Sequence, residues 1–285
     1  MHPAGSLIYF TVASGFGFGF LFFLGLGLPS VEGQGAFWRY FLAYGLAVSG
    51  LMSSVLHLGN PRNAWKALWQ WRSSWLSREG VVAIVTLAAF APVAIGQIFF
   101  ASNITWLGFV GATLSLGTVY CTAMIYGQLK TVPRWKQPLT PLVFLVFALT
   151  GGALLAQLYW IALMGFAVLL GVQIGHWMLG DRAWADKTDT PESATGLGGQ
   201  DGTVRLLERP HTGKNYLTTE MVHKVGRKHA LKLRGLTLGL LILAGLLALV
   251  NLWISAAVLG LAALVSRWLF FAEAEHVVGL YYGRR

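Results

Sequence analysis

The sequence predicts an all-α integral membrane protein, built as a bundle of eight transmembrane helices. Of its 285 residues, 55% are hydrophobic and only 11% are charged, whereas a soluble domain carries about 25% charged residues. Glycine (35 residues) and tryptophan (12 residues) are abundant, as is typical of close helix packing and of membrane interfaces. A soluble fold cannot bury this much apolar surface, so we expect the lipid bilayer to solvate the chain.

The eight predicted spans are apolar runs of about the 20 residues that the hydrocarbon core requires. The first run has no basic segment before it and no small-residue cleavage signal, so we interpret it as a retained helix and not as a signal peptide. Residues 140–179 carry no Lys, Arg, Asp or Glu over 40 positions, which is too long for one span, and we divide them near Gln157–Tyr159. The predicted helices cover residues 5–28, 37–58, 80–100, 104–128, 138–157, 159–179, 235–251 and 254–273.

One longer polar loop, residues 180–234, separates the sixth predicted helix from the seventh. Its first half is rich in glycine and polar residues, and its second half reads YLTTEMVHKVGRKHALKLRG. That half predicts a basic, weakly amphipathic helix at the membrane interface. The loop has too few apolar residues for a core of its own. We therefore expect residues 1–285 to form a single transmembrane domain with this loop outside the membrane.

Basic residues predict how the bundle is oriented. With eight spans, the loops after the second, fourth and sixth helices lie on the same side as both termini. Residues 59–79 hold four Lys or Arg, the loop after the fourth helix holds three and residues 180–234 hold ten, whereas the other side has Arg39 alone. The positive-inside rule then places the N- and C-termini in the cytoplasm. Contact with a partner on that side is another explanation for basic loops there.

Ionisable side chains in or beside the predicted spans are few, and they gather at one membrane face. Such groups are costly and by default indicate function. A proton or ion pathway would need polar residues across the full thickness, and a two-haem wire would need histidine pairs at two depths. A single shallow pocket suits a lipophilic ligand with a polar, redox-active head, such as a quinone, because histidine can bond its carbonyl and exchange protons. The residues concerned are His57, Arg78, Glu79, His176, Arg267, Glu273, Glu275 and His276.

These residues also have purely structural interpretations. His57 can cap the end of its helix. Arg78 and Glu79 can form a local pair at a helix start, where the helix dipole favours glutamate. His176, next to Trp177, can be an interfacial anchor, and the four tryptophans of residues 59–79 can be an aromatic belt.

Three stretches follow the pattern of a known family. The first reads SSVLHLGNPRNAWKALWQWRSSWLSREG, the second IYGQLKTVPRWKQPLTPLVF and the third SRWLFFAEAEHVVGLYYG. Together they resemble the DMSO reductase membrane-anchor family, and the third most resembles the subgroup attached to cytoplasmic sulfite-oxidising complexes. The resemblance spans most of the eight predicted helices but does not extend to residues 180–234.

The resemblance implies the membrane subunit of a three-part complex in a bacterial inner membrane. A molybdopterin catalytic subunit and an iron–sulfur subunit with [4Fe-4S] clusters would dock on one face. The anchor would carry no haem or metal and would exchange electrons with quinone, either ubiquinone or menaquinone. The family's quinone-site histidine falls on His57 and its glutamate on Glu79, and we expect Arg78 and Arg62 near the same ligand. Candidates for a second site or for proton exchange are His176, Arg267, Glu273, Glu275 and His276.

The sequence therefore predicts an anchor that passes electrons between a [4Fe-4S] partner and the quinone pool, with sulfite oxidation and quinone reduction favoured. A DMSO-type reductase anchor that oxidises quinol is the first alternative. A small-solute transporter is another, because the glycine-rich first helix and Gly151–Gly152 could mark broken helices; the lack of mid-membrane polar residues and of a repeat argues against it. A structural anchor without quinone and a b-type cytochrome also remain open, although the single cysteine, Cys121, cannot ligate a cluster.

Overall fold

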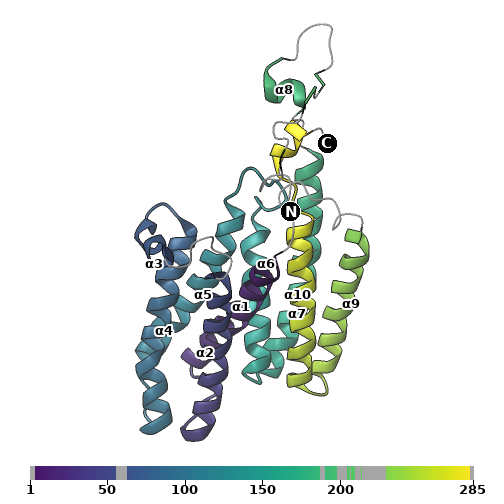
Figure 1. The fold of residues 1–285 in the computed structure, drawn as a ribbon. Helices are drawn as coiled ribbons and strands as arrows, with labels where there is room; N and C mark the ends of the chain where they lie inside the picture. The colour runs from purple at the N-terminus through teal and green to yellow at the C-terminus, as the bar shows by residue number, and fades with distance from the viewer. Residues whose placement is uncertain are drawn as a thin grey trace.

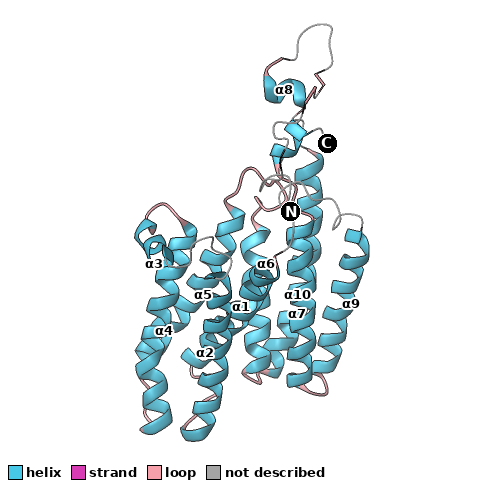
Figure 2. Cartoon of the chain, viewed as in Figure 1, coloured by secondary structure: helices cyan, strands magenta, loops and turns pink. Residues whose placement is uncertain are grey.

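The computed structural model describes residues 4–55, 63–186, 190–197, 204–205, 207–208, 213 and 229–282. Within these ranges the regular structure is entirely helical (Figure 2). Most of the predicted interfacial helix, residues 216–228, lies outside the described residues. The elements are α1 (Gly5–Gly25), α2 (Gly33–Val55), α3 (Ala64–Ala67), η2 (Leu68–Gln70), α4 (Trp75–Phe99), α5 (Thr105–Gly127), α6 (Leu139–Leu155), α7 (Tyr159–Ala185), α8 (Pro191–Thr195), α9 (Ala230–Ala248), α10 (Leu252–Ala272) and η5 (Val277–Tyr282).

A long helix stands at each of the eight predicted positions, and six of them are long and apolar enough to cross a membrane. The six are α1, α4, α5, α7, α9 and α10. Helix α6 has 17 residues, which rise about 26 Å against about 30 Å of hydrocarbon. Helix α2 is less apolar and is not among the six. The described residues thus support a multi-pass membrane protein, and the count of eight spans stays a prediction.

Successive long helices run in opposite directions, so the connections alternate between two ends of the bundle (Figure 1). One end holds α3, the connection 128–138 and residues 273–282, and we call it the terminal face because the first and last described residues, Ala4 and Tyr282, lie toward it. The other end holds four short connections, residues 26–32, 100–104, 156–158 and 249–251. Segments far apart in the sequence therefore meet at the terminal face: the N–H of Val277 donates to Thr131 O at 3.0 Å.

Exposed tryptophans mark the end opposite the terminal face. Trp38, Trp106, Trp160 and Trp253 lie close to the starts of α2, α5, α7 and α10, and each exposes half or more of its surface. Indole rings favour the boundary between headgroups and hydrocarbon. This ring of tryptophans indicates a membrane–water interface at that end.

Helix α1 is the central helix of the bundle. It packs on α2, α5, α6 and α10, and 83% of its most apolar stretch is buried. Gly17 lies against the backbone of Ala47 in α2, while Gly19 lies against the backbone of Ala148 and Gly152 in α6. Small residues let helix backbones approach this closely in membranes. The glycines therefore serve packing in unbroken helices, which removes the main argument for a transporter with broken helices.

The long uncharged stretch breaks between α6 and α7, as predicted. Gln157 adopts a left-handed φ of 60°. Its N–H donates to Leu154 O at 3.1 Å, and the N–H of Leu158 donates to Ala153 O at 2.8 Å. This is the hydrogen-bond pattern of a Schellman cap, which ends a helix by satisfying its last carbonyl groups. The backbone then reverses into α7 at Tyr159.

Gly19→Ala is expected to destabilise the bundle by about 1–3 kcal/mol, because a new methyl group would overlap the backbone of α6. Gly171→Ala, in α7, is the matched control, since open space surrounds that position. It should leave stability unchanged or raise it by up to about 1 kcal/mol through helix propensity. Thermal unfolding of the purified protein in detergent measures both, and equal midpoints for the two variants would contradict this packing.

Candidate functional site

Glu79 is a buried carboxyl group near the terminal face. Helix α4 begins after Ser74, whose hydroxyl accepts a hydrogen bond from the N–H of Ser77 at 3.4 Å. Glu79 follows in the second turn and is 3% exposed. Thr122 in α5 donates its hydroxyl to Glu79 Oε1 at 2.5 Å. Since a polar group is costly to bury without a partner, this bond is what holds the carboxyl group between α4 and α5.

Arg78 secures the segment that precedes α4. Its Nε donates to Trp71 O at 2.9 Å, and its NH2 donates to Arg72 O at 2.7 Å. The guanidinium also stacks on Trp75, 4.4 Å from the ring centre. These contacts give Arg78 a structural role, and its predicted contact with a ligand stays a prediction.

His57 and Arg62 lie outside the described residues. The structure describes α2 up to Val55 and the backbone again from Asn63. Their predicted places beside Glu79 therefore rest on the sequence alone.

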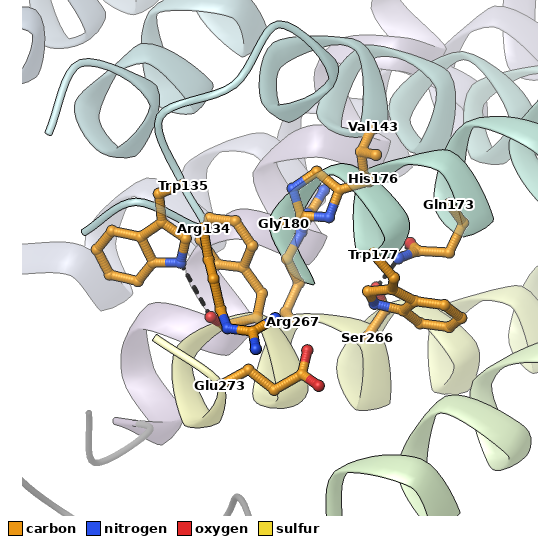
Figure 3. A pocket seen from close by; sticks show the side chains of 11 residues that line it. Arg134, Trp135, Val143, Gln173, His176, Trp177, Gly180, Ser266, Arg267 and Glu273 are labelled. Carbon is orange, nitrogen blue, oxygen red and sulfur yellow. Dashed lines mark hydrogen bonds between the residues drawn. The ribbon is translucent and has the colours of Figure 1, made fainter. Parts of the chain in front are cut away.

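A second polar cluster occupies the terminal face between α7, α10 and the connection 128–138 (Figure 3). It brings together three predicted residues, His176, Arg267 and Glu273, around a cavity of about 20 Å³. Glu275 and His276 do not line this cavity; His276 instead accepts a hydrogen bond from the N–H of Val278 at 3.1 Å. The lining residues are Arg134, Trp135, Val143, Gln173, His176, Trp177, Gly180, Ser266, Arg267, Phe270 and Glu273.

Hydrogen bonds determine which nitrogen of His176 carries the proton. Thr140 donates its hydroxyl to Trp135 O at 2.7 Å, and the same oxygen lies 3.2 Å from His176 Nε2. Because the threonine proton is already used, Nε2 has to be the donor of that second bond. In the neutral ring Nδ1 is then a bare acceptor, and it is buried without a partner among the described residues.

Arg267 is a buried cation, only 3% exposed. Its guanidinium lies 3.4 Å from the ring centre of Phe144 and 5.3 Å from that of Phe147. No carboxylate of the described residues pairs with it. Figure 3 shows its side chain extending toward His176. Buried charges are normally paired, so the aromatic contacts leave Arg267 with unmet hydrogen-bonding capacity beside the cavity.

Ion pairs close the outer rim of this cavity. Asp181 accepts from Arg134 and from both terminal nitrogens of Arg234, at 2.6 and 2.8 Å. Arg234 also donates from Nε to Glu273 Oε1 at 2.9 Å. Burial raises the pKa of Glu273 above its ordinary value, although the positive charge of Arg234 opposes the shift. The rim joins α7, α9, the 128–138 connection and the end of α10.

Tyr126 in α5 lies between the two polar sites. It packs on Trp135 and Phe270, which line the Arg267 cavity, and lies one helical turn after Thr122, which bonds Glu79. Its ring packs at the centre of an aromatic cluster that includes Trp135 and Phe270, with ring centres 5.2 and 5.5 Å away. Trp135 in turn donates its indole N–H to Phe270 O at 3.0 Å, which fixes the connection 128–138 against α10.

Several functional candidates escaped the sequence prediction. Thr122 and Tyr126 sit inside an apolar run, where nothing in the residue pattern distinguishes them from packing residues. Asp181 and Arg234 border predicted spans, and charges at the ends of apolar runs are the signal that could have identified them. Within the described residues, no group of three His, Cys, Asp or Glu side chains is arranged to hold a metal ion.

A larger groove of about 440 Å³ lies between α1, α2 and α10. Its lining is almost wholly apolar and includes no Asp, Glu, Lys, Arg or His. A redox-active headgroup needs hydrogen-bond donors and proton-exchanging groups. The Glu79 region therefore remains the stronger candidate for such chemistry.

Comparison with known proteins gives a consistent set of relatives. The family described as DMSO reductase anchor subunit (DmsC) matches residues 1–167. The C subunit of sulfite dehydrogenase from Allochromatium vinosum is 31% identical over 99% of both sequences. The C component of anaerobic dimethyl sulfoxide reductase from Escherichia coli is 31% identical over 38% of this protein and 39% of its own length. The YnfH component of an anaerobic dimethyl sulfoxide reductase from the same organism is 30% identical over 41% and 42%. No solved structure gives a significant match.

Asp181→Asn is expected to destabilise the protein by about 1–3 kcal/mol, because Arg134 and Arg234 would lose their shared counter-charge. The value is below that of a fully buried pair because the Asp181 side chain is 45% exposed. Asp186→Asn is the control: its pair with Arg182 is largely exposed and should contribute at most about 1 kcal/mol. Thermal unfolding in detergent compares them, and an effect of Asp186→Asn equal to that of Asp181→Asn would contradict this assignment.

Proposed function

This protein belongs to the DMSO reductase anchor subunit family, and from that premise we propose that it is the quinone-linked electron-transfer subunit of a three-subunit oxidoreductase. The partners are a molybdopterin catalytic subunit and an iron–sulfur subunit with [4Fe-4S] clusters. A bound quinone accepts or gives up electrons together with protons, which is why its site needs groups that exchange protons.

The observation that carries the proposal is the relation to the sulfite dehydrogenase relative over 99% of both sequences. The two dimethyl sulfoxide reductase relatives align with less than half of this protein. We therefore favour a complex in which sulfite is oxidised and quinone is reduced. The second candidate is a DMSO-type reductase in which quinol is oxidised, and the family match supports it. The helices themselves do not set the direction of electron flow.

Glu79 and Thr122 fit a quinone headgroup. The one hydrogen bond that the structure gives Glu79 uses Oε1, and Oε2 has no partner among the described residues. A carboxyl group held in this way can bond a quinone oxygen and exchange a proton with it. His57, which the family pattern places at the quinone, would supply the second polar contact.

The partner subunits would dock on the terminal face, which we propose is cytoplasmic in a bacterial inner membrane. The described parts of the first two basic connections, residues 63–74 and 128–138, lie there. Trp65, Trp69 and Trp71 on and beside α3 and η2 are exposed at this face, and Lys66 and Arg72 lie over two of their rings. Such a surface is suited to a protein partner or to the lipid headgroups.

Glu79→Gln is expected to lower quinone-coupled turnover of the purified complex by about 100-fold or more, because the amide cannot exchange a proton. Dye-coupled activity of the soluble subunits should be unchanged. Thr122→Ser keeps the hydroxyl that bonds Glu79 and should retain most of the turnover, whereas Thr122→Val should lose much of it. Normal quinone turnover in Glu79→Gln would remove Glu79 from the site.

His57→Ala should likewise abolish quinone-coupled turnover and spare dye-coupled activity.

Co-purification provides the test of the partners: the subunits isolated with this anchor should contain molybdenum and iron–sulfur clusters. An anchor that purifies without quinone would be purely structural, and a haem absorption band in the isolated protein would indicate a b-type cytochrome; either result contradicts the proposal.

A further inference from the structure

The cavity beside Arg267 contains two buried groups with complementary needs. His176 Nδ1 requires a hydrogen-bond donor, and the Arg267 guanidinium, which contacts two phenylalanine rings and pairs with no carboxylate of the described residues, can donate to an acceptor. Both residues line the same space, and both are more than nine-tenths buried. A single hydroxyl oxygen meets both needs, because it accepts from Arg267 and donates to Nδ1. A carbonyl or carboxylate oxygen cannot donate and would leave Nδ1 unsatisfied.

The size of the cavity selects the ligand. Its volume is about 20 Å³, and a polar cavity of about 10–15 Å³ on this measure holds one water molecule. A quinone ring does not fit. A water molecule is therefore the ligand that fits: it can accept from the Arg267 guanidinium, donate to His176 Nδ1 and occupy the cavity volume.

The cavity also reaches the aqueous rim. Glu273 lines it, and its side chain is 10% exposed. Burial raises the pKa of this carboxyl group, and the charge of Arg234 opposes the shift. The charged or titratable groups around Glu273 are Arg267 on α10, His176 and Asp181 on α7, Arg234 on α9 and Arg134 on the connection 128–138.

On the inner side, Trp135 and Phe270 line the cavity and pack on Tyr126 of α5, with ring centres 5.2 and 5.5 Å away. Thr122, one helical turn before Tyr126 in α5, donates to Glu79. Tyr126 and Thr122 are thus the polar side chains of α5 on the side of the cavity that faces Glu79. His176 positions the water and does not carry the proton, because its Nε2–H is committed to Thr140.

We propose that this cavity is the proton port of the anchor: it holds one water molecule between Arg267 and His176 Nδ1, and Glu273 delivers protons through that water toward Glu79. The inference rests on the proposed function, in which quinone reduction consumes one proton for each electron. It assigns Glu273 as a proton donor at the terminal face, and His176 and Arg267 as positioning residues.

The test compares Glu273→Gln with Asp186→Asn in the intact complex. Glutamine keeps an acceptor for Arg234 but cannot release a proton, whereas Asp186 is an exposed carboxylate on the same face. Glu273→Gln should lower quinone-coupled turnover by about tenfold or more, with dye-coupled activity and binding of a quinone analogue unchanged. Wild-type turnover should decline as pH rises past the pKa of Glu273, and the variant should lack that step. Asp186→Asn should behave as wild type.

A high-resolution structure of the wild-type complex supplies a readout independent of turnover. Density for one water within hydrogen-bond distance of Arg267 and His176 Nδ1 is expected. An empty cavity would overturn the proposal. Turnover and a pH profile equal to those of the wild type in Glu273→Gln would also overturn it. If Glu79→Gln is inactive in the same assay, the quinone site is retained and only the proton port is rejected.

Discussion

The cost of placing charged groups in an apolar bundle governs the arrangement of the terminal face. Glu79 is buried with one hydroxyl partner, and Arg267 is buried against two phenylalanine rings. Neither would be retained in a helix that served packing alone, because uncompensated charge is strongly unfavourable there. Around them the fold brings together α4, α5, α7 and α10 with the connection 128–138, although these segments span most of the sequence. Among the described residues, the buried Asp, Glu, Lys, Arg and His side chains are confined to Glu79, His176, Arg267 and Glu273.

Two polar sites of different character result from this arrangement. At the Glu79 site, the described residues give the carboxyl group one hydrogen bond, from Thr122 to Oε1, and we propose that the other oxygen meets a ligand that exchanges protons. The Arg267 site is a water-sized cavity with a cationic rim balanced by Asp181 and Glu273. An aromatic cluster around Tyr126 separates them. That separation allows electrons to reach a quinone from one part of the terminal face while protons enter from another.

The sequence predicted the helical fold and the positions of the long helices, because apolar runs and their charged boundaries reflect the thickness of the bilayer directly. It also predicted the break near Gln157, because an uncharged stretch of 40 residues is too long for a single span. It identified His176, Arg267 and Glu273 as unusual, but it could not show that they share one cavity with Arg134, because that depends on which helices are neighbours. The pairing of Glu79 with Thr122 was equally out of reach, since a threonine within an apolar run usually bonds its own helix backbone. Arg78 shows the reverse case: its place beside Glu79 suggested a shared site, whereas its donors secure the preceding segment.

The central claim is that quinone binds beside Glu79 at the terminal face. Photo-crosslinking of the intact complex with a quinone analogue that carries its reactive group on the ring tests it most directly. Peptide mapping should place the label on the first turns of α4 and the last turns of α5, and Glu79→Gln should reduce the labelling. Label confined to the groove between α1, α2 and α10, or to the tryptophan ring at the opposite end, would contradict the account.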